Sequence, residues 1–113
     1  NSQCFSLEIA DTQELRTKGL SNRSHLPENS GMLFVFPESR IYNFWMKDTL
    51  ISLDIIWISD DLEIVHMEKN NQPCTPNLCP SLTPNKPALY VLETKANVSE
   101  KYNISLGDKV SLS

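Results

Sequence analysis

The alternation of polar and apolar residues along the chain predicts a mainly β fold. Residues 4–10 and 62–68 alternate with the two-residue period of half-buried strands. Residues 32–36 and 50–59 are more continuously apolar, which is typical of strands covered on both faces. The same reasoning predicts three further strands, at residues 41–47, 88–94 and 109–112. About seven short strands separated by turn residues indicate a small β barrel or sandwich.

Two short helical segments are expected beside these strands. Asp11 and Glu14 have the spacing of a capping box, so a helix of about three turns should follow the first strand and end within residues 19–22. A helical turn fits residues 97–102, near the C-terminus. The predicted fold class is therefore mainly β, with one short helix after the first strand and a helical turn near the end.

Length and composition restrict the classes of function. The 113 residues correspond to one domain, and the content of 40% hydrophobic and 21% charged residues is that of a globular protein. The net charge is −4 and the Lys and Arg residues are scattered, so we expect no nucleic-acid partner. The longest apolar runs are about five residues, against the roughly 20 of a membrane helix, so no transmembrane segment is expected.

Segments spread over nearly the whole chain share the pattern of one known family. They are residues 9–12 with Glu14 and Gly19-Leu20, residues 26–28, residues 31–36, residues 44–51 (Phe-Trp-Met-Lys-Asp-Thr-Leu-Ile), residues 53–55, Pro73-Cys74, Cys79-Pro80, residues 90–93 and residues 106–108. On these segments the chain resembles the bacterial and archaeal family called domain of unknown function 192. It departs from the family pattern at Asp48, where Asn is usual, and at Ser52, where Pro is usual. The resemblance implies a small, mainly β fold and supplies no established reaction or catalytic residues.

The cysteines lie in a proline-rich segment. Residues 70–87 hold five of the seven prolines and predict a long irregular loop, which in a small domain is either functional or pinned. Within it, Cys74 and Cys79 are five positions apart, which is not the Cys-x-x-Cys spacing of redox and zinc sites. A local disulfide is the favoured interpretation; the alternatives are two thiols, or a metal site completed by Cys4 or His66. No metal and no cofactor are predicted, and Cys4 is expected to be buried on its strand.

The most suggestive candidate for a binding site is the segment around Trp45. If the strand alternation holds, Trp45 and Lys47 share one face, and an aromatic ring beside a cation is suited to a sugar ring or an anionic group. The alternative is that Trp45 packs in the core while Lys47 and Asp48 form a solvated strand end. Asp54 lies inside an apolar stretch, where a carboxylate must be hydrogen-bonded, paired or exposed. It either caps the backbone amides of a neighbouring loop or has a ligand-binding or acid/base role.

The remaining binding candidate is His66, and no catalytic motif accompanies it. His66 is expected to share one strand face with Ile64 and Glu68, a position in which a lone histidine is usually structural or exposed. The chain contains no Gly-x-Ser-x-Gly, no His-Glu-x-x-His and no Gly-rich phosphate loop. Whether the protein is an enzyme is therefore left open.

These observations favour a ligand-binding or accessory module at the cell envelope. The cysteine pair, and a chain that begins with Asn1 and not with Met, suggest a periplasmic or secreted protein. Its site would lie between residues 45–48 and the 74–79 loop, and its ligand would be a small molecule, a carbohydrate or an envelope protein. One alternative is a small hydrolase of envelope carbohydrate or peptide that uses Asp48 and Asp54. A second is a structural domain that binds a partner at a sheet edge.

Overall fold

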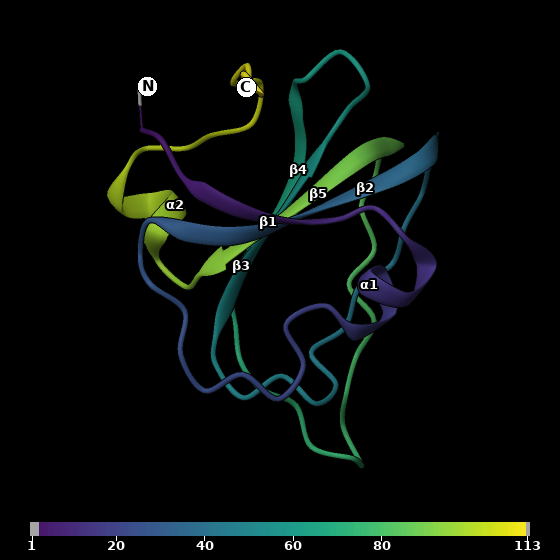
Figure 1. Cartoon of the computed structure of the whole chain (residues 1–113), viewed down its shortest axis with the longest axis vertical. Coiled ribbons are helices and arrows are strands. Elements are labelled where there is room, and N and C mark those ends of the chain that lie inside the picture. Colours follow the sequence, from purple (N-terminus) through teal and green to yellow (C-terminus); the bar gives the residue numbers. More distant parts are fainter. Residues whose placement is uncertain (1–2, 113) are drawn as a thin grey trace.

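One mixed β-sheet organises the molecule in the computed structural model, which describes residues 3–112 (Figure 1). The five strands follow the order β1-β2-β5-β3-β4 across the sheet. β1 is parallel to β2, and the other neighbouring pairs are antiparallel. The elements are β1 (Ser6–Ala10), α1 (Gln13–Lys18), β2 (Ser30–Arg40), β3 (Leu53–Ile58), β4 (Ile64–Asn71), β5 (Ala88–Lys95) and α2 (Val98–Lys101).

The two faces of the sheet are covered differently. In Figure 1 the long loops and α1 lie on one side of the strands, and α2 and both chain ends lie toward the other. Because successive strand side chains point to opposite faces, β3 contributes to both sides and all of its residues are buried. Fully burying one large aliphatic side chain there stabilises the fold by roughly 1.5–3 kcal/mol.

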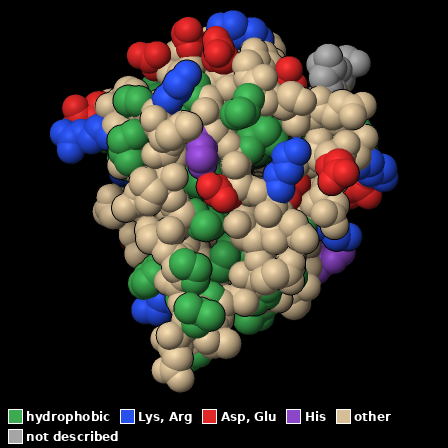
Figure 2. All heavy atoms as spheres, turned by 180° about the vertical axis from the view of Figure 1, so that it is seen from behind, with side chains coloured by type: hydrophobic (Ala, Val, Ile, Leu, Met, Phe, Trp, Pro, Cys, Tyr) green, Lys and Arg blue, Asp and Glu red, His purple; other side chains and the backbone are tan. Residues whose placement is uncertain are grey.

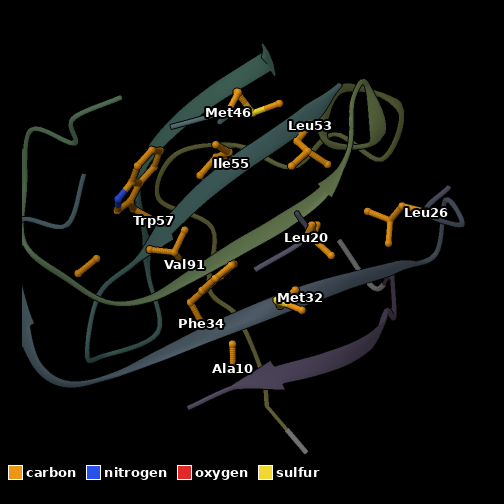
Figure 3. Close-up of a cluster of buried hydrophobic side chains, with 11 residues drawn as sticks. Ala10, Leu20, Leu26, Met32, Phe34, Met46, Leu53, Ile55, Trp57 and Val91 are labelled. Atoms are coloured by element: carbon orange, nitrogen blue, oxygen red, sulfur yellow. The ribbon is translucent and has the colours of Figure 1, made fainter. Parts of the chain in front are cut away.

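The larger core lies between the sheet and the long loops. Its side chains come from β1, β2, β3 and β5 and from the segments that follow α1 and β2, and Figure 3 shows them pointing toward one another. Its labelled members are Ala10, Leu20, Leu26, Met32, Phe34, Met46, Leu53, Ile55, Trp57 and Val91. The opposite face carries a smaller cluster around Ile56, Ile58 and Ile64. The long loops are therefore part of the packed structure and not appendages to it.

The predicted mainly β class, the short helix after the first strand and the C-terminal helical turn are confirmed, and the sheet is a single open one. Two of the predicted strands do not form. Residues 41–47 contribute one isolated bridge, from Phe44 to Leu82, and residues 109–112 contribute one from Lys109 to Glu63. Burial does alternate along residues 41–47, with Phe44 partly buried and Met46 buried. The alternation thus marks an extended segment with one face on the core, without a neighbouring strand to form a ladder.

The helix α1 begins one residue later than the capping-box pattern predicts and, with six residues, is shorter than the three turns expected. Thr12 is the N-cap, and its hydroxyl accepts a hydrogen bond from the Leu15 amide at 3.1 Å, so the prediction of Asp11 as cap is wrong. The helix ends at Gly19, whose φ of 48° lies in the left-handed region that glycine adopts readily. A Cβ at Gly19 would lie 3.3 Å from the Phe34 ring. The glycine thus lets the end of α1 approach the sheet closely.

Candidate functional site

A cleft of about 270 Å³ opens between α1 and the extended segment of residues 41–49. The last turn of α1 and the residues just after it form one wall, and residues 42–45 with Lys47 and Thr49 form the other. Side chains from β2 and β5 complete the lining. The residues that matter for its chemistry are Arg16, Phe36, Phe44, Trp45, Lys47 and Glu93.

Aromatic rings in mutual contact line the inner part of this cleft. Phe36 stacks on Tyr42 with ring centroids 3.6 Å apart, and Phe44 meets Phe34 edge-on at 5.0 Å. The buried Trp57 donates from its indole Nε1 to the Tyr42 carbonyl oxygen at 2.9 Å, which fixes the backbone of the outer wall. This arrangement gives the cleft a preformed apolar wall.

Trp45 and Lys47 lie together at the outer end of the cleft. Trp45 is 53% exposed, and the Lys47 Nζ lies 5.2 Å from the centroid of its indole ring. The two side chains thus share one side of the segment, and Trp57, not Trp45, occupies the core. Asp48 is exposed and does not line the cleft. Its φ of 59° is a conformation that Asp and Asn tolerate best among residues other than glycine.

Arg16 brings a second positive charge from α1. Its Nη1 donates to the Val35 carbonyl oxygen at 2.7 Å, and its guanidinium carbon lies 5.3 Å from the centre of the Phe36 ring. Among residues 3–112, neither Arg16 nor Lys47 forms an ion pair with a carboxylate. Lys18 lines the cleft as well and forms no such pair, so the cleft holds three cations without an ion-pair partner in the described chain.

Glu93 places a carboxyl group at the inner end of the same cleft. It pairs in register with Met32 on β2 and with Ile55 on β3, both core residues, so its side chain lies on the core face. It is 5% exposed and forms no hydrogen bond or ion pair with any residue that the structure describes. Burial raises the pKa of Glu93 to about 8. The group is thus mostly protonated at neutral pH, and it opens onto the cleft without a partner.

Asp54 lies on the opposite face of the sheet and is fully buried. One carboxylate oxygen accepts from the Asn70 amide at 2.8 Å, and the other accepts from the amide and hydroxyl of Ser99 at 3.0 and 2.7 Å. Asn97, the N-cap of α2, makes no side-chain capping bond, so Asp54 supplies the anion at this helix start. The interpretation in which Asp54 caps backbone amides is confirmed. Asp48 is exposed whereas Asp54 is fully buried, and neither lines the cleft beside α1.

His66 is held away from the cleft by two contacts. Its Nε2 lies 2.8 Å from the Glu68 carboxylate, and its ring meets the Trp57 ring edge-on at 5.2 Å. His66 and Glu68 lie on the same face of β4, as predicted, but Ile64 does not lie on that face. The pairing register shifts between Trp57, which pairs with His66, and Ile58. Because of this shift, Ile64 points to the other face of the sheet and packs in the smaller cluster there.

Cys74 and Cys79 form the predicted disulfide, with Cα atoms 4.9 Å apart. The loop that they close packs against the core through Cys74, and Leu82 and Phe44 exchange two backbone hydrogen bonds of 2.6 and 2.9 Å. Residues 70–87 do not line the cleft beside α1, and a site between residues 45–48 and the 74–79 loop stays a prediction. Cys4 is exposed, which makes the prediction of a buried Cys4 wrong.

The surface of the loop region is poor in charge. Figure 2 shows charged side chains along the upper edge of the molecule and few at its lowest part, and Lys86 is the one charged residue of residues 72–87. Within residues 3–112, no helix is long and apolar enough to cross a membrane. The same part of the chain contains no cluster of three or more His, Cys, Asp or Glu side chains suited to a metal ion.

Comparison with known proteins places the chain in a family. Residues 1–112 match domain of unknown function 192, DUF192, which is described as Uncharacterized ACR. The chain belongs to the DUF192 family. A search among curated proteins finds no match.

Two crystal structures resemble this DUF192 protein closely. One is a candidate transcription regulator from Sinorhizobium meliloti 1021, with 32% identity and a TM-score of 0.85, covering 91% of this chain and 78% of that one. The other is a protein of unknown function from Novosphingobium aromaticivorans, with 32% identity and a TM-score of 0.87, covering 96% of this chain and 75% of that one. Crystal structures of two related proteins therefore have the same fold, and their descriptions do not establish a function for the cleft.

Sequence reasoning missed several residues of the cleft in this DUF192 protein, among them the ionisable residues Glu93 and Arg16. The signal for Glu93 is present, because a carboxyl inside an apolar strand raises the same question that Asp54 raises. Arg16 gives no such signal, since its place beside Phe36 depends on how α1 crosses the sheet. Of the predicted candidates, Trp45 and Lys47 belong to the cleft, and the others lie elsewhere.

Proposed function

We propose that this DUF192 protein is an extracytoplasmic binding module that holds a small polar molecule in the cleft between α1 and residues 41–49. The observation that carries the proposal is the Glu93 carboxyl, which is almost fully buried, has no partner among the described residues and opens onto the cleft. Burying a carboxyl without a partner destabilises a fold, and such groups cluster at functional sites. A ligand in the cleft would supply the missing partner.

The shape and lining of the cleft support a small ligand. Its volume of about 270 Å³ lies near the lower end of the roughly 300–1,000 Å³ typical of ligand pockets. An aromatic wall with a few convergent polar groups is the usual composition of such pockets. Trp45, half exposed beside Lys47, adds a flat surface at the entrance against which a ligand can pack.

The disulfide supports the extracytoplasmic location. Bonds such as that between Cys74 and Cys79 persist in oxidising compartments and are rare in a reducing cytosol. The description of one relative as a candidate transcription regulator raises DNA as another ligand. DNA binding requires a basic surface that neutralises phosphates, whereas this chain has a net charge of −4. A small molecule therefore fits the chain better than nucleic acid.

The proposal is tested by nuclear magnetic resonance with ¹⁵N-labelled protein and mixtures of sugars, amino acids and carboxylic acids. We expect at least one compound to shift the signals of Arg16, the Trp45 indole and Glu93 together. The same compound should lose most of its effect on Glu93→Gln and keep it on Glu100→Gln, a matched change at an exposed position of α2. If no compound shifts these signals, or if the shifts map to the opposite face of the sheet, the proposal is wrong.

A further inference from the structure

We propose that the ligand of this cleft is a small dipolar molecule whose ammonium group pairs with Glu93 and whose anionic group pairs with Arg16 and Lys47. A free amino acid is the simplest member of this class. The inference rests on the proposed function and specifies the ligand of the same site. Charged groups of both signs line this one cleft without neutralising one another.

Arg16, Lys47 and Glu93 all line the cleft and lack an ion-pair partner in the described chain. Neither Arg16 nor Lys47 is in an ion pair with any carboxylate of residues 3–112. Glu93 has no partner in the same range, and its pKa is raised by burial with no opposing effect from a nearby cation. No ion pair joins Glu93 to either cation, so the three groups do not satisfy one another. A ligand that satisfies all three must carry opposite charges at its two ends.

A ligand of any other charge type would leave at least one of the groups Arg16, Lys47 and Glu93 without a partner. A simple anion would pair with Arg16 and Lys47 and leave the buried Glu93 carboxyl without a partner. A simple cation would pair with Glu93 but would meet the positive charges of Arg16, Lys18 and Lys47, all of which line the cleft. An uncharged sugar would accept a hydrogen bond from protonated Glu93 and leave the cations unneutralised.

The contacts of Arg16 and of the aromatic rings suit the anionic end and the ammonium end of such a ligand. Arg16 uses Nη1 for the Val35 carbonyl and makes no other side-chain hydrogen bond within the described chain, so its remaining N–H groups are available to a carboxylate. Its guanidinium is already positioned against Phe36. An ammonium group near Glu93 would also lie beside the aromatic wall, where ring faces attract cations.

Binding of a dipolar ligand should release protons, and the number released for each ligand bound can be measured. Near pH 7 Glu93 carries a proton in the empty cleft. When an ammonium group binds, the carboxyl ionises, the ammonium pairs with the carboxylate, and the proton passes to the buffer. About one proton is therefore released for each ligand bound, and fewer are released above pH 8, where Glu93 is already ionised.

The test is calorimetric titration at pH 7 with the twenty common amino acids, in two buffers of different ionisation enthalpy. We expect at least one amino acid to bind with release of about one proton, and acetate, methylamine and glucose to bind at least about tenfold more weakly. Glu93→Gln should abolish the proton release and weaken binding at least about tenfold, while Glu100→Gln should change neither.

The possible outcomes separate this inference from the proposed function. Glucose or acetate binding as tightly as every amino acid, or amino acids binding without proton release, overturns the dipolar ligand but leaves a small-molecule site. Failure of all twenty amino acids to bind also overturns the inference. The proposed function itself falls if, in addition, no compound perturbs the cleft in the resonance experiment.

Discussion

The Glu93→Gln variant is expected to be more stable than the wild-type protein at neutral pH, although it changes a side chain at the proposed site. The carboxyl has an ordinary pKa of 4.5, and burial raises the pKa of Glu93 in the folded protein to about 8. Between these two values the unfolded chain releases the proton and the folded protein keeps it. Stability is therefore greatest below about pH 4.5 and falls as the pH rises toward the folded-state pKa.

The size of the effect follows from this pKa difference. One pKa unit corresponds to about 1.4 kcal/mol. Glu93 should therefore lower the free energy of unfolding by roughly 3 kcal/mol at pH 7, and by roughly 5 kcal/mol above pH 8. These figures are upper limits, since the carboxyl reaches the water of the cleft. Gln is uncharged and similar in shape, so the variant escapes the ionisation cost while retaining the packing.

Urea unfolding between pH 4 and pH 8.5, followed by the fluorescence of the buried Trp57, measures the effect. The stability difference between Glu93→Gln and wild type should be small at pH 4 and should grow with pH. Glu100→Gln, at an exposed position of α2, should show no such trend. A difference that stays constant over this range, or a variant less stable than wild type at pH 8, would refute the reasoning.

Three further changes test the structural supports of the fold and the cleft. Asp54→Asn should lower the free energy of unfolding by about 3 kcal/mol, because the new amide group would place an N–H donor against the buried N–H donors that Asp54 accepts from. The control Asp48→Asn, at an exposed position, should change it by less than about 0.5 kcal/mol, and equal effects of the two changes in urea unfolding would contradict this. Gly31→Ala should cost more than about 2 kcal/mol, because its Cβ would lie 2.5 Å from a carbonyl oxygen of β5; an unchanged melting temperature would contradict this. Replacing Cys74 and Cys79 by Ser should cost about 2 kcal/mol by freeing the loop, and a loss below about 0.5 kcal/mol in urea would count against a stabilising disulfide.

Features that depend on neighbours in sequence could be predicted. The apolar run of β3 indicates a strand covered on both faces, and every residue of that strand is buried. Trp45 and Lys47 are two residues apart on an extended segment, so their shared side and their contact follow from local geometry. For the same reason the disulfide between Cys74 and Cys79 could be expected from five residues of separation.

Features that depend on the path of the chain could not be predicted. The strand order depends on pairing between distant segments, because β5 lies between β2 and β3 while residues 41–47, which connect those two strands in sequence, form only one isolated bridge. Asp54 was expected to bind amides, but its partner Ser99 is 45 positions away. Likewise, only the fold brings Arg16 to one side of a cleft and Glu93 to its inner end.

The measurement that tests the central claim most directly is a pH titration of the Glu93 carboxyl carbon by ¹³C nuclear magnetic resonance, with the signal assigned by its absence in Glu93→Gln. A buried carboxyl without a partner should titrate with a midpoint near pH 8 in the ligand-free protein. With a saturating amino acid bound, the midpoint should move well below that value, because the ammonium group favours the ionised form. A midpoint near 4.5 in the empty protein would contradict the account, since Glu93 would then be solvated or already paired.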